Sequence, residues 1–235
     1  MIPFKPNEGK KLNITTADFG TFSRYPVRTH LIMKDDILVD LMDKYVIEYL
    51  EPGDMIFMSE KIVAITQGRS FPIKDIKVTR MANFLVRFVH KSPYGLGLGS
   101  PWTMQLAINE IGIVKVLFAA FFSAITKPFG IRGVFYRILG DQARAIDGPC
   151  ECVIPPYNQH AKLAPFKPND VALVLQEKTG CPVVIIDAND LGVEILGRSS
   201  KDINVQMCKQ IFKDNPLDQT IQQTPIAIVR RCPTS

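Results

Sequence analysis

Apolar residues recur along the chain at two different spacings, and the alternation between them predicts a mixed α and β protein. From 35 to 50 they recur every three or four positions, which is typical of an amphipathic helix. Segments bounded by caps, glycines or prolines predict further helices at 77–90, 102–111, 169–179 and 206–213. Short apolar runs predict strands at 55–65, 132–139, 150–154, 183–186 and 225–230, and extended pieces with turns at 13–34.

The most apolar segment of the chain is 111–131, which is rich in Ile, Val, Leu, Phe and Ala. Lys115 and Lys127 interrupt it, and the uncharged stretch between them, 116–126, is too short to cross a bilayer as a helix. We therefore predict a buried helix here. A helix that lies on a membrane surface or binds a partner is the alternative.

The composition is that of a folded globular protein, with 46% apolar and 22% charged residues among 235. The net charge is +5, but the basic residues are scattered, which argues against a nucleic-acid surface and favours a basic pocket for a phosphorylated small molecule. The five cysteines lack the spacing of a disulfide framework, so we expect reduced, buried thiols. The N-terminus has no apolar signal core, and we expect a cytoplasmic protein without a membrane partner.

An acidic cluster follows the clearest predicted strand, 183–186. Asp187, Asn189 and Asp190 lie just beyond its C-terminal end, where α/β proteins commonly bind ligands. Their oxygen atoms suit Mg²⁺ or Mn²⁺, although the same residue types are also typical of a simple polar turn. Asp147 is a second acidic candidate from a distant segment, and spacing alone does not show whether the two converge.

Ser59, Glu60 and Lys61 form a polar patch within the otherwise apolar run 55–65. A lysine buried in such a strand would need an anionic partner. A nucleotide phosphate would meet this need, and so would a structural carboxylate, so both interpretations stay open.

These segments together resemble the family of coenzyme F420 gamma-glutamyl ligases. Residues 51–69, which contain Gly53-Asp54 and end in Gln67-Gly68-Arg69, are similar to the nucleotide-binding segment of that family. Ala145-Ile146-Asp147 resembles its Ala-Gly-Ile-Asp motif, and Val184-Ile185-Ile186-Asp187 resembles a strand that ends in Asp-Thr-x-Gly. The closing segment 224–230 is similar as well, and the motifs occur in the family's order over most of the chain.

Members of this family join an amino acid to a substrate carboxylate after GTP has activated the carboxylate as an acyl phosphate. The resemblance therefore implies an α+β fold with mixed sheets and packed helices, a homodimer, and Mg²⁺ or Mn²⁺ with GTP or ATP as co-substrate. It implies that Asp147 and Asp187 bind metal, with Asn189 or Asp190 as a further ligand, and it singles out no catalytic side chain. The nucleotide would lie beside Ser59, Glu60, Lys61, Gln67, Gly68 and Arg69.

The chain also departs from the family. Ile65 stands where a phosphate-facing lysine is usual, and Ala188 replaces a hydroxyl ligand. Segment 93–140 has no counterpart in the family, so we expect a single ligase-like domain, 1–235, whose interlocked subdomains, 13–92 and 141–235, surround this insertion.

Three hypotheses follow. The first is a metal- and nucleotide-dependent gamma-glutamyl ligase-like enzyme that adds an amino acid to a small anionic acceptor. The second is a non-catalytic relative that binds a nucleotide or another phosphorylated small molecule. The third is an interaction protein that docks through the apolar segment 111–131.

Overall fold

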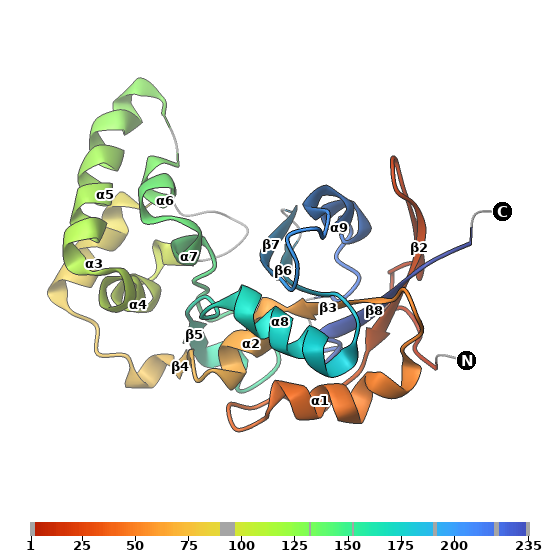
Figure 1. The fold of residues 1–235 in the computed structure, drawn as a ribbon. Helices are drawn as coiled ribbons and strands as arrows, with labels where there is room; N and C mark the ends of the chain where they lie inside the picture. Colours follow the sequence, from red (N-terminus) through yellow and green to blue (C-terminus); the bar gives the residue numbers. More distant parts are fainter. Residues whose placement is uncertain are drawn as a thin grey trace. The chain divides into compact units, whose positions relative to one another are not determined.

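The computed structural model divides the chain into two compact units. Unit 1 combines Met1–Gln67 with Pro165–Ser235, and unit 2 is the continuous segment Gly68–Ala164. The structure describes residues 3–89, 97–131, 133–151, 153–189, 192–218 and 221–233. Helices and strands both contribute to the two units, so the prediction of an α+β protein is confirmed (Figure 1).

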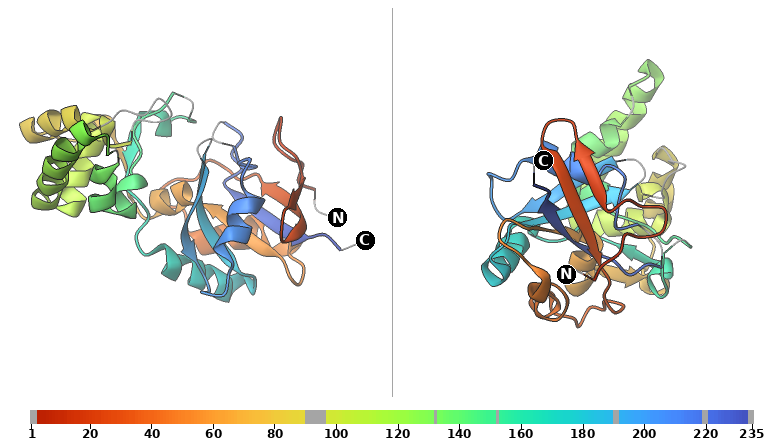
Figure 2. Two further views of the ribbon diagram at one scale, coloured as in Figure 1. Left: turned by 90° about the horizontal axis from the view of Figure 1, so that it is seen from above. Right: turned by 90° about the vertical axis from the view of Figure 1, so that its right-hand side faces the viewer.

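Unit 1 is built on a six-stranded mixed sheet with the strand order β1-β2-β8-β3-β6-β7. Among the described strands of this sheet, β3 and β6 run parallel and every other neighbouring pair is antiparallel. Because β8 lies between β2 and β3, the sheet joins the two ends of the chain (Figure 2). The strands are β1 (Asn13–Thr16), β2 (Gly20–Val27), β3 (Met55–Ser59), β6 (Val183–Asn189), β7 (Gly192–Arg198) and β8 (Ile226–Arg231).

Helices cover both faces of this sheet. On one face, Phe212 at the end of α9 stacks on Phe57 of β3 with the ring centroids 4.3 Å apart. On the other face α8 packs against β6 and β7, and α1 packs on α8. Gly197 of β7 permits this close approach, because a Cβ atom there would lie 2.6 Å from the backbone of Pro168. The helices are α1 (Leu38–Tyr45), α2 (Glu60–Thr66), α8 (Pro168–Thr179) and α9 (Val205–Ile211), with a 3-10 turn at Ile47–Tyr49.

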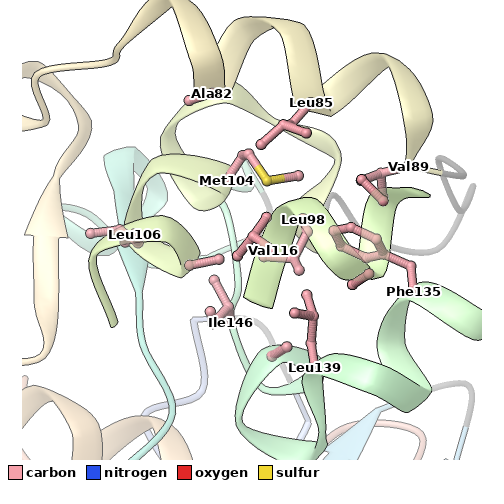
Figure 3. Packing of buried hydrophobic residues seen from close by; sticks show 14 of the residues in the cluster. Ala82, Leu85, Val89, Leu98, Met104, Leu106, Val116, Phe135, Leu139 and Ile146 are labelled. Atoms are coloured by element: carbon pink, nitrogen blue, oxygen red, sulfur yellow. The ribbon is translucent and has the colours of Figure 1, made fainter. Parts of the chain in front are cut away.

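Unit 2 is mainly helical and has an apolar core of its own. Figure 3 shows Leu85, Met104, Val116 and Phe135 meeting in this core, and all four are almost fully buried. The helices are α3 (Arg80–Leu85), α4 (Pro101–Ile111), α5 (Ile113–Thr126), α6 (Val134–Leu139) and α7 (Asp141–Arg144). Two short antiparallel strands, β4 (Ser70–Pro72) and β5 (His160–Lys162), complete the unit with 3-10 turns at Ile73–Asp75, Val86–Phe88, Gly97–Gly99, Lys127–Phe129 and Tyr157–Gln159.

Unit 2 is inserted into the connection between the parallel strands β3 and β6. The chain leaves β3 through α2, passes through the whole of unit 2, and returns through α8 to β6. The segment 93–140, which we expected to be an insertion, lies entirely within this unit. On the unit 1 side of the junction, the side-chain amide of Gln67 donates to the Phe166 carbonyl at 2.8 Å and accepts from the Phe166 backbone N–H at 2.7 Å.

The prediction of a strand over 55–65 is wrong in its second half. The strand ends at Ser59, and the next seven residues form α2. Ser59 caps this helix, since its Oγ accepts the backbone N–H of Lys61 at 3.3 Å. Most of α2 is buried, so its sequence lacks the polar face that distinguishes an amphipathic helix from a buried strand.

Two other strand predictions are also wrong. Residues 134–139 form the helix α6 between Gly133 and Gly140, both of which have positive φ. A six-residue helix is too short for its period to show in the sequence. The described part of 150–154 forms turns and irregular structure, and Cys150 is disulfide-bonded rather than reduced. Cys181, Cys208 and Cys232 are free thiols, as expected.

The apolar segment 111–131 forms α5, but the prediction that this helix is buried is wrong. Only Val116, Ala119 and Ala120 of α5 are buried, whereas Val114 is 78% and Phe121 is 61% exposed. In the part of the chain that the structure describes, no helix combines the length and apolar character needed to span a membrane.

Candidate functional site

The candidate site lies at the carboxyl end of the parallel strands β3 and β6. These strands pair in register from Ile56 with Val183 to Ser59 with Ile186. Glu60, the first residue after β3, and Asp187, the residue of β6 after Ile186, therefore follow the last paired positions of two parallel strands. This edge is where sheets with parallel strands commonly bind ligands, because the loops and helices that follow the strands begin there.

The first half of the site is Ser59-Glu60-Lys61, which the sequence singled out as a polar patch. Ser59 ends β3 and caps α2, so Glu60 and Lys61 are the first residues of that helix. Glu60 is only 2% exposed, whereas Lys61 is half-buried. A carboxylate at the start of a helix is stabilised by the backbone N–H groups and the helix dipole.

The second half of the site is Asp187 and Asn189, two residues apart on β6 and therefore on the same side of the strand. Val184 and Ile186 face the core that α9 covers, so Asp187 and Asn189 lie on the opposite face, where α8 packs. Both are half-buried, and Asn189 Nδ2 donates to Asp187 Oδ1 at 3.5 Å. Asp190 lies outside the described residues.

Sequence reasoning missed a further acid at this edge, Glu194 of β7. Glu194 lies directly opposite Asp187 in the antiparallel β6–β7 pair, and Lys209 of α9 neutralises it through an ion pair of 2.9 Å. The signal was present in the sequence, because a hairpin that pairs the segments on either side of Asp190 would bring these residues together. The edge thus carries Glu60, Asp187 and Glu194 with the cations Lys61 and Lys209.

Asp147, the other predicted metal ligand, belongs to unit 2 and has a cation beside it. Its backbone pairs with that of Lys162, and Lys162 Nζ lies 3.4 Å from Asp147 Oδ2. The Lys162 side chain is 5% exposed and also donates to the Ala145 carbonyl at 3.1 Å. In the structure Asp147 therefore pairs with a buried lysine, whose ammonium group would oppose the binding of a divalent cation at this carboxylate. No local pattern in the sequence links these two residues.

The last three predicted nucleotide-binding residues lie at the junction of the two units and make structural contacts. Gln67 is held by the backbone of Phe166, and Gly68 adopts a φ of +69° that favours glycine. Arg69 donates from Nε to the Ala164 carbonyl at 2.5 Å and from Nη2 to Glu110 at 2.6 Å. The β3–β6 pairing therefore brings the Ser59-Glu60-Lys61 segment to the edge that carries Asp187 and Asn189, whereas Gln67 and Arg69 form hydrogen bonds within their own units.

Oxygen ligands for a metal are present at the β3–β6 edge, but they are few. Within the described residues no group of three or more His, Cys, Asp or Glu side chains is placed to hold a metal ion. No protein-family model and no curated protein matches this chain.

Proposed function

We propose that this protein is a metal- and nucleotide-dependent amide ligase and that the β3–β6 edge holds the cation and the phosphates. The observation that supports this most directly is the pairing of β3 with β6. It places Ser59, Glu60 and Lys61 next to Asp187 and Asn189, although more than 120 residues separate the two segments along the chain. Both segments also carry the resemblance to the gamma-glutamyl ligases.

The side chains at this edge fit Mg²⁺ or Mn²⁺ in chemistry. Asp187 and Asn189 offer a carboxylate and an amide oxygen on one side of β6, and both are half-buried. Mg²⁺ commonly takes one or two carboxylates and completes its coordination with water and phosphate oxygens, so a sparse set of ligands is sufficient. A bound cation would supply charge neutralisation for the transferred phosphoryl group.

The protein's own groups would position the nucleotide and exclude water. Lys61, half-buried at the start of α2, would bind phosphate oxygens. Glu60 is buried at the turn between β3 and α2, and its contacts would fix the position of Lys61. Positioning and electrostatic stabilisation supply most of the rate in phosphoryl transfer.

The proposed reaction has two steps that balance without a further reactant. The acceptor carboxylate takes the γ-phosphoryl group of the nucleoside triphosphate, which forms an acyl phosphate and releases the diphosphate. The amine of the amino acid then attacks the acyl carbon. A C–N bond forms, the C–O bond to phosphate breaks, inorganic phosphate leaves, and the amine loses a proton to solvent.

A second candidate function is the binding of a nucleotide or a phosphorylated small molecule without catalysis. Two observations favour it. Ile65 is 4% exposed and packs in the core, so this position serves packing where the ligases present a lysine. Asp147 is already paired with Lys162.

Thermal unfolding of the purified chain with GTP or ATP, each with and without Mn²⁺, tests both candidates. A ligand that binds only the folded state at a hundredfold excess over its Kd adds about 2.7 kcal/mol of stability. We expect a nucleotide-dependent rise in Tm that requires Mn²⁺ and is lost in Asp187→Asn. Asp43→Asn is the matched control, because Asp43 is a surface carboxylate that pairs with Lys178.

Phosphate release then separates the two functions. A ligase releases phosphate only when a carboxylate acceptor and an amino acid are both present. A metal-dependent rise in Tm with no turnover for any acceptor pair would support the binding protein instead. If no nucleotide raises Tm in the presence of Mn²⁺, the β3–β6 edge is not a nucleotide site and the ligase proposal fails. Only the non-catalytic binding of another phosphorylated small molecule is then left.

A further inference from the structure

The helix α5 of unit 2 has two apolar faces, and only one of them is packed. Val116, Ala119 and Ala120 face inward, and Figure 3 shows Val116 within the core of unit 2. The outward face is also apolar, with exposed fractions of 78% at Val114, 39% at Leu117, 54% at Phe118, 61% at Phe121, 37% at Phe122 and 46% at Ile125. We call these six residues the α5 stripe.

The α5 stripe has the geometry of one continuous helical face. Val114, Phe118, Phe121 and Ile125 follow at steps of four, three and four residues, so they lie in one row along the helix. Leu117 and Phe122 flank this row, and the Phe118 and Phe122 rings lie 4.5 Å apart between centroids. Phe129, just beyond the helix, is 78% exposed and extends the apolar surface. Contiguous exposed apolar surface of this kind marks an interaction site.

The net charge of unit 2 indicates the charge of the surface that the α5 stripe would bind. Unit 2 contains 12 Lys and Arg and five Asp and Glu, a net charge of +7, whereas unit 1 contains 16 and 18, a net charge of −2. Only the unit that carries the α5 stripe therefore has a net positive charge.

Within unit 2 the net positive charge is concentrated in the segment 76–140, which contains most of its helices. Residues 76–140 contain eight Lys and Arg, including Arg87, Lys115, Lys127 and Arg137, and a single acid, Glu110. Glu110 is already paired with Arg69 at 2.6 Å, so it does not offset these charges. The four named basic side chains are exposed.

We propose that unit 2 binds an anionic phospholipid surface through the α5 stripe. The apolar row would enter the boundary between headgroups and acyl chains, and the surrounding Lys and Arg would contact the anionic headgroups. The helix would lie in the plane of the surface, since no described helix can span a bilayer.

The charge also distinguishes this surface from a second copy of the chain. Two α5 stripes packed against each other would bring together two units that each carry a charge of +7, and like charges at an interface oppose association. An anionic surface would instead attract the exposed cations of unit 2, among them Arg87, Lys115, Lys127 and Arg137.

Co-sedimentation of the full chain with vesicles tests the proposal. The vesicles contain phosphatidylcholine either alone or mixed with phosphatidylserine. We expect binding to the mixed vesicles that exceeds binding to phosphatidylcholine alone and that weakens as salt is added, because salt screens the headgroup charges. The double variant Phe118→Ser/Phe121→Ser should bind at least about tenfold more weakly, since each buried aromatic side chain contributes strongly to transfer from water.

The matched control is Leu173→Ser/Val174→Ser, which removes two comparably exposed apolar side chains from α8 in unit 1. This variant should bind vesicles as the wild type does, and both variants should keep the wild-type Tm because the altered side chains are exposed. A Phe121→Trp variant should show stronger quenching of indole fluorescence by brominated acyl chains than the wild type, in which Trp102 supplies the background.

Three results would overturn the proposal. The first is an absence of binding to mixed vesicles, and the second is unchanged binding by Phe118→Ser/Phe121→Ser. The third is a lipid-free dimer, detected by sedimentation velocity, that dissociates in this same variant, because it would make a second copy the occupant. None of these results bears on the nucleotide site, since the α5 stripe contains no residue of the β3–β6 edge.

Discussion

Asp54 accepts two hydrogen bonds from the guanidinium group of Arg230, with Nε and Nη2 each 2.8 Å from a carboxylate oxygen. The carboxylate is fully buried and also accepts the Glu51 backbone N–H at 2.8 Å, which closes the turn before β3. The hydrogen bonds and the charge of Asp54 raise the pKa of Arg230. The pair joins the turn before β3 to β8.

Removal of the Asp54 charge should therefore destabilise unit 1. We expect Asp54→Asn to lower the free energy of unfolding by about 3 kcal/mol, because Arg230 would keep its charge without its principal partner. Denaturant unfolding followed by circular dichroism measures this change. Asp43→Asn, which alters an exposed ion pair with Lys178, should change stability by less than about 1 kcal/mol. Equal effects of the two substitutions would show that the Asp54–Arg230 pair contributes no more than a surface pair.

The ion pair between Arg24 and Asp214 predicts a loss of stability in acid. Desolvation opposes ionisation of Asp214, but the hydrogen bonds and charge of Arg24 outweigh it and lower the pKa of this carboxyl group. Since the folded-state pKa lies below the unfolded value, the contribution is present above pH about 4 and is lost as the pH falls further. The stability difference between wild type and Asp214→Asn should shrink over this range. A difference that stays constant from pH 7 to the acid limit would contradict this assignment.

Cys208 of α9 should behave as an inert thiol. It is fully buried in the core of unit 1, and desolvation raises its pKa to about 12. The thiolate is the reactive form, so a disulfide reagent at pH 8 should modify Cys208 only after unfolding, whereas the half-buried Cys232 should react in the native protein. Peptide mapping after brief labelling identifies the modified residues. Because ionisation is favoured in the unfolded chain, Cys208 should also contribute a fall in stability above pH about 9.

Gly197 is the position in β7 where the addition of a single methyl group should lower the stability of the fold. A Cβ atom would lie 2.6 Å from the carbonyl group of Pro168, a backbone contact that only a shift of α8 or β7 could relieve. We expect Gly197→Ala to lower the free energy of unfolding by about 2–3 kcal/mol.

Gly180 is the contrasting position for this test. Its φ is +72°, and a Cβ atom there would meet no neighbour within 4 Å. Gly180→Ala should cost about 1 kcal/mol, and Gly180→Asn should cost less because asparagine tolerates the left-handed region. No such relief is expected for Gly197→Asn. A harmless Gly197→Ala would show that α8 does not pack as closely on β7 as described.

The elements with the clearest boundaries could be predicted from the sequence. The helix α8 begins at Pro168 and ends before Gly180, and the β-branched run of β6 follows directly, as the pattern indicates. The short buried helix α2 could not be distinguished from a strand, because four of its seven residues are buried and apolar. Burial of a whole element removes the periodic signal on which such predictions depend.

In the candidate site, too, the local sequence pattern predicts some features, whereas contacts between segments far apart in the chain could not be predicted. The positions of Asp187 and Asn189 at the end of a strand follow from the local pattern alone. Their position beside Ser59 and Glu60 depends on the pairing of β3 with β6 across the whole of unit 2, and the pairing of Asp147 with Lys162 depends on a turn of the chain that no motif marks. The exposure of α5 could not be predicted from the sequence. An apolar run indicates contact with an apolar environment, but it does not show whether this environment is the protein's own core or a partner outside it.

The insertion of unit 2 between α2 and α8 leaves the sheet of unit 1 independent of segment 68–164. The two points where the chain leaves and re-enters unit 1 are fastened by the reciprocal Gln67–Phe166 hydrogen bonds, and immediately beyond them the Leu163 backbone N–H donates to the Arg69 carbonyl at 2.9 Å. The sheet that unites the two chain ends takes no strand from segment 68–164. A chain in which a short linker replaces this segment should therefore keep the sheet.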